Sequence, residues 1–223
     1  DTFGPELTAQ LKTKLKGVAG LQLIRRPGRD GRQVGKMHRC YLVWAEQGVM
    51  ELVLLTEPEK ILDLDLTGPG RNGGGAVETP LVLVCTHAKR DTCCAVKGRP
   101  LAAELVEDYP DMVWETSHTK GHRFAPSVML MPWGYSFGRM NKEAAAQMIA
   151  AAARGKYFYP VNRGRGIFGP RGQVAELAVA RALIDAGEEL SYGQLTATDS
   201  GEVSHIDGRR WRVALEEREV EGV

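Results

Sequence analysis

Apolar residues recur along this chain with two periods, and each period predicts a different kind of element. Leu7, Leu11 and Leu15 are spaced four residues apart, which predicts a helix over Glu6–Lys16 that begins next to Pro5. Three later segments also have the pattern of a helix: Leu101–Tyr109, an alanine-rich segment from Asn141 to about Ala153, and an amphipathic segment that ends at Gly187.

Short apolar or alternating runs predict the strands. The clearest is Pro80–Cys85, a continuous apolar run of the kind expected for a central strand that is buried on both faces. Other short runs predict further strands at Leu21–Arg25, Cys40–Ala45, Met50–Leu55, Met112–Glu115, Ser127–Met131 and Tyr135–Met140. The dipeptide Asp207-Gly208 is a type I′ turn signal, so we expect a hairpin in the last part of the chain.

The order of these elements predicts an α/β fold. The stretch Gly68–Gly75 is the clearest linker, and it separates an N-terminal α/β subdomain over 1–70 from a larger domain over 76–223. After the linker the order is β-α-β-ββ-α, as in thioredoxin-type domains, with a histidine-containing loop in place of the helix that normally precedes the hairpin. We therefore expect a mixed sheet flanked by helices, with additional N-terminal α/β and C-terminal helix-hairpin segments.

A second glycine-rich segment, Gly164–Gly169, matches the pattern G-x-G-x-x-G. A dinucleotide site needs this pattern directly after a buried strand and at the start of a helix, whereas here Pro160 precedes it and Pro170-Arg-Gly172 interrupts it. The pattern therefore predicts a loop. Its arginines, Arg163, Arg165 and Arg171, form a candidate docking site for an acidic redox partner.

Composition narrows the class of protein. The 29 Lys and Arg residues nearly balance the 28 Asp and Glu residues, which argues against a dedicated nucleic-acid binder. The chain has neither an apolar run long enough to span a membrane nor a signal-peptide pattern. It begins at Asp1 without a methionine, which is consistent with the loss of a preceding segment. Four unevenly spaced cysteines are no disulfide framework, so we expect a reducing, cytoplasmic location.

The candidate chemistry lies between positions 85 and 122. This stretch holds three of the four cysteines and three of the five histidines: Cys85, Cys93, Cys94, His87, His118 and His122. Thiolate and imidazole are the ligands that zinc and iron–sulfur centres select. The spacing of His118 and His122 lets two rings converge, and Gly121 between them favours a loop. Sequence alone leaves Cys93 and Cys94 as alternative ligands.

His87 is a weaker candidate ligand. Cys85-Thr-His87 matches the first half of a Rieske box, but the required Cys-x-x-His half is missing, because Val96 and Lys97 stand three residues after Cys93 and Cys94. We therefore interpret His87 as a residue that supports the site or the fold.

Two other classes of site compete with an iron–sulfur cluster. Structural zinc sites usually have tightly spaced cysteine pairs, whereas eight residues separate Cys85 from Cys94, and this wide spacing favours the larger cluster. A thioredoxin-type redox enzyme would need Cys-x-x-Cys, but Val82 and Ala88 stand where the second cysteine would be. A structural zinc-binding module and a thiol-dependent redox enzyme remain the alternatives.

Several motifs together resemble the sucrase/ferredoxin-like family. They are Cys85-Thr-His-x-x-Arg-Asp-x-x-Cys94, Trp114-Glu-x-Ser-His118, Gly121-His-Arg-Phe-Ala125, Gly138-Arg139 and Gly172-Gln-Val-Ala-Glu176. The resemblance extends from about Leu21 to Leu215 and is densest over Val84–Arg139. It implies a thioredoxin-like ferredoxin domain with one [2Fe–2S] cluster, bound by Cys85, Cys94, His118 and His122. The position of Cys94 in the family motif is the reason to prefer it to Cys93.

The resemblance also implies a function and supporting residues. We expect one-electron transfer with a redox partner protein or reductase, so that the chain is more an electron-transfer protein than a catalyst. The cysteines would bind one iron and the histidines the other. Arg90, Asp91 and Arg123 are candidates to hydrogen-bond the sulfides or imidazoles. We expect neither nucleic acid nor a membrane as a partner.

Overall fold

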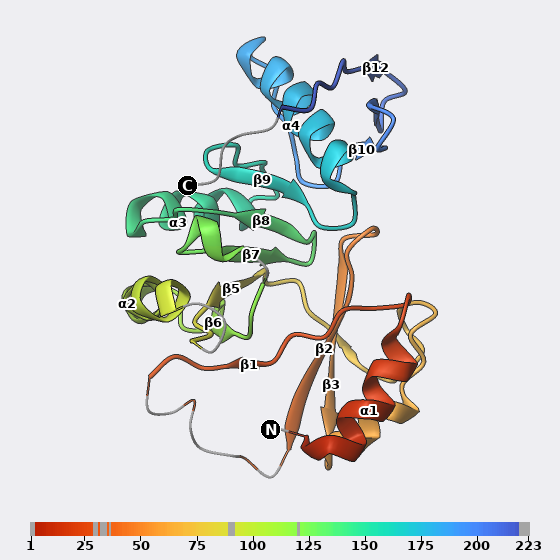
Figure 1. The fold of residues 1–223 in the computed structure, drawn as a ribbon, viewed down its shortest axis with the longest axis vertical. Helices are drawn as coiled ribbons and strands as arrows, with labels where there is room; N and C mark the ends of the chain where they lie inside the picture. Colours follow the sequence, from red (N-terminus) through yellow and green to blue (C-terminus); the bar gives the residue numbers. More distant parts are fainter. Residues whose placement is uncertain are drawn as a thin grey trace.

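The computed structural model describes residues 3–28, 31, 35, 37–88, 92–119 and 121–218, with His122 described by its backbone alone. Its helices and strands are shown in Figure 1 and are, in chain order, α1 (Gly4–Leu15), β1 (Ile24–Arg25), β2 (His38–Trp44), β3 (Val49–Leu55), the 3-10 helix η2 (Pro58–Asp63), β4 (Gly75–Ala76), β5 (Leu81–Cys85), α2 (Thr92–Asp108), β6 (Val113–Thr116), the 3-10 helix η3 (His122–Phe124), β7 (Val128–Met131), β8 (Tyr135–Phe137), α3 (Lys142–Ala152), β9 (Asn162–Arg165), α4 (Pro170–Asp185), β10 (Leu195–Ala197), β11 (Glu202–His205) and β12 (Arg210–Arg212).

A six-stranded mixed sheet, ordered β1-β6-β5-β7-β8-β9, forms the centre of the molecule. Strands β5 and β6 are parallel, and the other neighbours are antiparallel. The parallel pair is joined by α2, as a parallel connection requires a crossover. In the described part of the segment between β6 and β7, the short η3 is the only helix. This arrangement confirms the predicted mixed sheet flanked by helices, including the loop in place of a helix before the hairpin.

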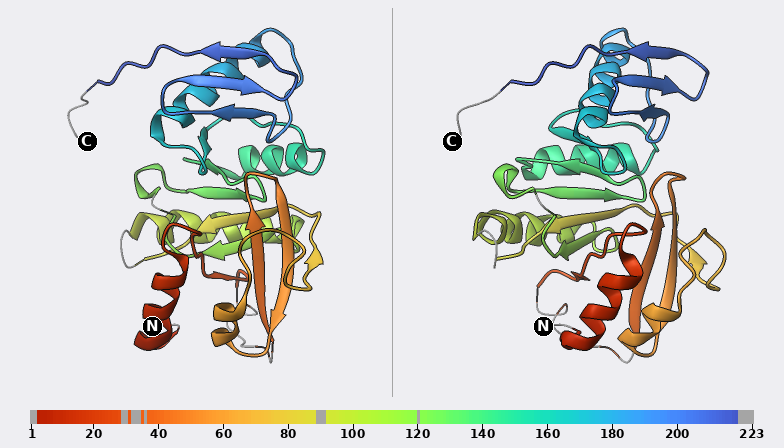
Figure 2. Two further views of the ribbon diagram at one scale, coloured as in Figure 1. Left: turned by 90° about the vertical axis from the view of Figure 1, so that its right-hand side faces the viewer. Right: turned by 45° about the vertical axis from the view of Figure 1, so that its right-hand side comes forward.

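The two faces of the sheet are covered by different elements. Val82 and Val84 of β5 face α2 and α3 in the largest hydrophobic cluster. Leu81 and Leu83, which alternate with them, pack in a second cluster with Trp114 and residues of the β2–β3 hairpin. The helices and the hairpin therefore lie on opposite sides of the sheet, as two views show (Figure 1, Figure 2). Every side chain of β5 is buried, as its continuous apolar sequence predicts.

The predicted boundary near the linker is crossed by main-chain pairing. Ile24 and Arg25 of β1 pair with Thr116 and Glu115 of β6, so the N-terminal segment supplies the outer strand of the central sheet. Within the linker itself, Gly75 and Ala76 form β4, which pairs with β3. The remaining N-terminal elements, α1 and η2, lie side by side at the far end of the hairpin (Figure 1).

The C-terminal part of the chain adds α4 and a three-stranded sheet, β10-β11-β12, that packs against it (Figure 2). The predicted turn at Asp207-Gly208 joins β11 to β12.

The loop predicted for the glycine-rich segment Gly164–Gly169 is wrong in part: Gly164 and Arg165 lie in β9, an edge strand of the central sheet. Pro170 begins α4, since proline is well suited to the first position of a helix.

A buried polar network connects β8, β9 and α4. Glu176 is fully buried, accepts a hydrogen bond from the Tyr135 hydroxyl (2.5 Å), and accepts another from the Arg165 amide (3.2 Å). Burial raises the pKa of Glu176 to about 7, against the lowering effect of these two hydrogen bonds. The ring of Tyr135 also contacts those of Tyr157 and Tyr192.

The side chain of Arg165 extends the network to the β2–β3 hairpin. Its guanidinium donates to the carbonyl oxygens of Trp133 (2.9 Å), Ala45 and Glu46 (3.1 Å). Arg165 is 2% exposed. The turn between β2 and β3 is therefore held by one buried cation that lies 120 positions later in the chain.

Among the described residues, no helix combines the length and the hydropathy that crossing a membrane requires.

Candidate metal centre

The candidate ligands lie where β5 and β6 end. Cys85 is the last residue of β5 and is fully buried, and its Cα is paired in register with that of Thr116, the last residue of β6. His87 follows β5 by two residues, and His118 follows β6 by two residues. Because the two strands are parallel, both short segments leave the sheet at the same edge. The rings of His87 and His118 are 6.0 Å apart between centroids.

Helix α2 brings Cys94 to the same edge. Cys94 is fully buried in the first turn of α2, whereas its neighbour Cys93 is exposed. Gly98 lies one turn further on the same face of the helix as Cys94. A Cβ at Gly98 would overlap the carbonyl group of Cys85 and would lie 3.6 Å from the Thr86 side chain. Glycine therefore permits the turn that follows Cys94 to contact the end of β5.

The helix is longer than its sequence predicts, and this changes the setting of both cysteines. The apolar pattern predicts a helix from Leu101, but α2 begins at Thr92 and passes through Pro100. The proline removes one backbone hydrogen bond, and the buried residues on both sides of it, Gly98 and Leu101 among them, keep the helix against the sheet. Cys93 and Cys94 are therefore neighbours on a helix, where Cys93 is exposed and Cys94 is buried.

The segment that carries His118 and His122 packs on the same strand end. The Ser127 carbonyl accepts a hydrogen bond from the Cys85 amide (2.9 Å). The Ser127 hydroxyl lies 3.2 Å from that of Thr119. A Cβ at Gly121 would lie 2.7 Å from the Ser127 hydroxyl, so this loop approaches Ser127 as closely as glycine permits. Three separate segments with thiol or imidazole side chains therefore meet around the end of β5.

The described side chains do not close into a metal-binding group. Among them, no three His, Cys, Asp or Glu residues are arranged so that they could hold a metal ion. Alternation along β5 places Cys85 on the face of Leu81 and Leu83, whereas α2 covers the other face. The His122 side chain and the predicted supporting residues Arg90 and Asp91 lie outside the described residues, and Arg123 is exposed. The ligand set Cys85, Cys94, His118 and His122 stays a prediction.

The ring of His87 lies beside that of the candidate ligand His118, although the sequence indicated only a supporting role for His87. Its Nδ1 is buried and has no hydrogen-bond partner among the described residues. A buried imidazole nitrogen without a partner costs free energy, unless another group completes its environment. The sequence signal was present in the Cys85-Thr-His87 spacing, although the spacing alone could not show that the ring lies beside that of His118.

Sequence reasoning missed Glu115, the buried acid that supports both strand ends. The Glu115 carboxylate accepts hydrogen bonds from Arg25, with an Nε–Oε2 distance of 2.7 Å, and from the Thr86 hydroxyl (3.1 Å). Thr86 directly follows Cys85, so the carboxylate joins β1, β6 and the segment after β5. The available signal was a charged residue that directly follows two apolar residues, Val113 and Trp114, in a strand.

The predicted arginine docking site does not form as a patch. Arg165 is buried in the polar network, and Arg171 donates to Glu217 and to the Asp199 carbonyl. Arg163 alone lies near the candidate centre: its guanidinium stacks 3.7 Å from the centre of the Phe124 ring. The same guanidinium lies 3.4 Å from the position of a Cβ at Gly121, and burial lowers the pKa of Arg163. A cation therefore lies against the histidine loop.

The four cysteines are not joined by disulfides. Cys40, on β2, is partly buried, and burial raises the pKa of its thiol. That shift disfavours the reactive thiolate form, in agreement with a structural role for this residue.

Comparison with protein-family models matches the model described as sucrase/ferredoxin-like to residues 3–164. This span is more than half of the 223 residues, and the chain belongs to that family. The matched span includes the central sheet through most of β9 and all the candidate ligands, and it ends before α4 and the C-terminal sheet. No curated protein and no solved structure matches the chain.

Proposed function

We propose that this member of the sucrase/ferredoxin-like family binds one [2Fe–2S] cluster and performs one-electron transfer. In this proposal Cys85 and Cys94 bind one iron, and His118 and His122 bind the other. The observation that carries the proposal is the meeting of three segments at the end of β5, each bearing a candidate thiol or imidazole ligand. When bound, the cluster would accept one electron from a donor and pass it to an acceptor.

The donor set fits this cofactor in its chemistry. Two thiols and two imidazoles can complete the coordination of two irons. The Nδ1 of His87, which has no hydrogen-bond partner in the part of the chain that the structure describes, also supports an environment that another component completes. Cys85 and Cys94 are both fully buried, which would keep water away from iron–sulfur bonds.

The remaining residues of the centre have supporting roles in the proposal. Ser127 and Thr119 hold the histidine loop on the strand that ends at Cys85. The Arg163 guanidinium beside Gly121 favours the additional negative charge that reduction brings to the centre. His87 lies beside His118, where it can hydrogen-bond a ligand or the cluster.

Burial also bears on the two alternative classes. A thiol-dependent enzyme needs a cysteine that its substrate can reach, and Cys85 and Cys94 are fully buried. Exposed Cys93 is the remaining candidate near the site, and its neighbour in sequence, Cys94, points into the protein. A structural zinc module would use the same ligands, so metal analysis has to distinguish it from the cluster.

The proposal extends to partners and location. Electron transfer requires a redox partner protein or reductase. In this proposal the partner docks on the exposed part of the histidine loop, which includes Arg123. Four thiols without a disulfide agree with a reducing compartment, and we propose a cytoplasmic location.

The test is an iron, sulfide and zinc analysis of protein purified without oxygen and of protein reconstituted with iron and sulfide. The expected result is about two irons and two sulfides per chain, with visible absorbance that reduction bleaches. One zinc per chain, with no sulfide taken up on reconstitution, would establish the zinc module instead. A colourless protein that takes up neither metal would overturn both.

A further inference from the structure

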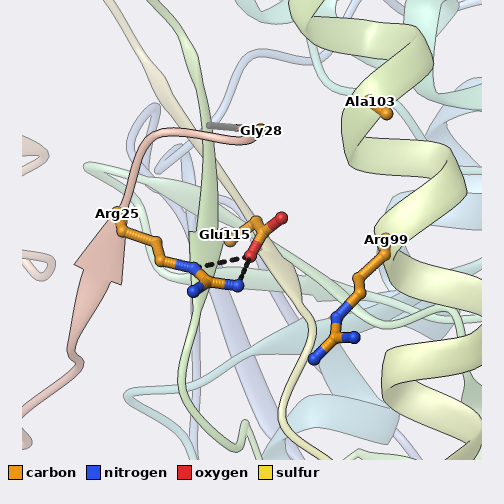
Figure 3. A pocket seen from close by; sticks show the side chains of 5 residues that line it. All are labelled: Arg25, Gly28, Arg99, Ala103 and Glu115. Atoms are coloured by element: carbon orange, nitrogen blue, oxygen red, sulfur yellow. Dashed lines mark hydrogen bonds and ion pairs between the residues drawn. The ribbon is translucent and has the colours of Figure 1, made fainter. Parts of the chain in front are cut away.

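A groove separate from the ligand positions runs between β1, β6 and α2. It has a volume of about 360 Å³ and is lined by Arg25, Gly28, Arg99, Ala103 and Glu115 (Figure 3). This volume is within the range of pockets that hold small molecules. Its charged groups come from three elements that meet only in the folded chain.

Glu115 presents one oxygen to the protein and leaves the other available. The residue is 6% exposed. Oε2 accepts the hydrogen bonds from Arg25 and from the Thr86 hydroxyl. No hydrogen bond to Oε1 is made by any residue that the structure describes, and Figure 3 shows this second oxygen directed away from the Arg25 guanidinium. A largely buried carboxylate oxygen of this kind is a strong acceptor for a ligand hydroxyl.

Arg99 supplies an uncompensated positive charge on the other side of the groove. It lies in the second turn of α2, and its side chain extends into the same space as that of Arg25 (Figure 3). Within the described part of the chain, no carboxylate forms an ion pair with Arg99. Two guanidinium groups and one carboxylate give the lining a net charge of +1, so the groove favours an anion.

We propose that this groove binds a small oxyanion that also carries a hydroxyl group, such as hydrogen phosphate, a phosphomonoester with a free alcohol group, or a hydroxycarboxylate. The planar fork of Arg99 binds two oxygens of the anion, which is the geometry that guanidinium offers to phosphate and carboxylate. The hydroxyl of the ligand donates to Oε1 of Glu115. An anion without a proton to donate would bring its oxygen against that carboxylate and would be repelled. The site is independent of any cluster, because none of its lining residues is a proposed ligand.

The test uses pairs of anions that differ in one hydroxyl group. Binding to the full chain is measured by calorimetric titration with phosphate and with sulfate, then with lactate and with propionate. Phosphate keeps a proton at neutral pH and sulfate does not; lactate has the hydroxyl that propionate lacks. The expected result is at least about tenfold tighter binding of the hydroxyl-bearing member of a pair, as the loss of one charge-assisted hydrogen bond predicts. The pair that shows this preference identifies the phosphate or the carboxylate class.

Substitutions locate the binding to the groove. Arg99→Gln is expected to weaken binding by about tenfold or more, whereas Lys97→Gln, the same charge change at an exposed position of the same helix outside the groove lining, is expected to leave it unchanged. Glu115→Gln is expected to remove the preference for phosphate over sulfate, because its amide can donate to either anion. A thermal melt shows whether this variant folds, and the Arg99 and Lys97 variants decide the question without it.

Three results would overturn the proposal. They are equal affinities within both anion pairs, equal effects of the Arg99 and Lys97 substitutions, and no binding of any of the four anions. None of these results depends on whether the protein contains iron, so a failure here is distinguishable from a failure of the cluster proposal.

Discussion

Two polar regions of this protein are built on opposite principles. Around Glu176, the carboxylate, the Tyr135 hydroxyl and the Arg165 guanidinium all have hydrogen-bond partners within the chain. The exception in that cluster is the Tyr157 hydroxyl, which has no partner among the described residues. At the ends of β5 and β6, thiol and imidazole side chains gather, yet the described ones form no group that could hold a metal. One region is complete within the chain, whereas the other brings donors together without completing a site.

This difference distinguishes polar side chains that stabilise the fold from polar side chains that are available to bind a ligand. Buried polar groups that satisfy one another specify a packing arrangement, and their removal should affect the stability of the fold. The donors at the ends of β5 and β6 come from the end of a strand, a helix turn and a loop, and the Nδ1 of His87 has no hydrogen-bond partner among the described residues. Changes to these donors should affect the binding of another component. Substitutions in the two regions are therefore expected to change different measurements.

The largest expected effect is the loss of the cofactor on changing Cys94. Cys94→Ser replaces a proposed thiolate ligand, so reconstituted protein should lose most of its iron and its visible absorbance. Cys93→Ser changes the exposed neighbour and should leave both nearly unchanged. Iron analysis and the absorption spectrum measure the difference between the two variants.

Comparison of the two variants also distinguishes the loss of a ligand from the loss of the fold. Both variants make the same chemical change at adjacent positions of one helix, and unfolding by denaturant reports whether either loses its fold. If Cys93→Ser bleaches the protein and Cys94→Ser does not, the two residues exchange roles.

The next effect concerns stability at the Glu176 network. Arg165→Met removes the donor for three carbonyl groups and a cation near a buried carboxyl, so the free energy of unfolding should fall by about 3 kcal/mol. Arg171→Met, at a half-exposed arginine, should change it by less than about 0.5 kcal/mol. Equal denaturation midpoints for the two variants would show that the hairpin turn does not depend on Arg165.

A smaller and pH-dependent effect is expected for Glu176. Its pKa is raised from 4.5 to about 7 in the folded protein, mainly by burial, so the folded state holds a proton that the unfolded state releases within this window. Its contribution to stability is therefore greatest below pH 4.5 and falls as pH rises toward about 7, by up to about 3 kcal/mol.

Glu176→Gln should remove this part of the pH dependence. The measurement is the difference in unfolding free energy between wild type and variant at pH values on either side of the window. A difference that stays constant with pH would mean that Glu176 is ionised throughout and that Arg165 compensates for its charge.

Much of the fold could be predicted because its elements carry local signals. The continuous apolar run of β5 gave its position at the centre of the sheet, and Asn141 marked the start of α3, where its side chain accepts a hydrogen bond from the Ala144 amide. The start of α2 could not be predicted, because burial on both sides of Pro100 outweighs the local preference of proline. Strand β9 could not be predicted because Asn162–Arg165 contains no apolar side chain, and the strand is specified by pairing with β8.

The candidate centre could be predicted in its residue types but not in its arrangement. The spacing of Cys85 and Cys94 indicated a site. The burial of Cys94 and the exposure of Cys93 follow from their positions on α2, and the apolar pattern predicted the start of this helix too late to show them. Glu115 and Arg25 are ninety residues apart and meet only because β1 pairs with β6, so no local pattern could show their ion pair.

The hydrogen bonds from Arg165 to the turn of the β2–β3 hairpin have a consequence for synthesis on the ribosome. Ala45 and Arg165 are 120 positions apart, so at about 5–20 residues per second the turn exists for roughly 6–24 s before the side chain that holds it is made. During that interval the β2–β3 hairpin can form its own ladder, but its position over the central sheet is not yet fixed at the turn. The hydrogen bonds between Arg165 and the hairpin turn therefore form late. Nascent chains that end before Arg165 should be cleaved by a protease near Ala45 more readily than the complete protein.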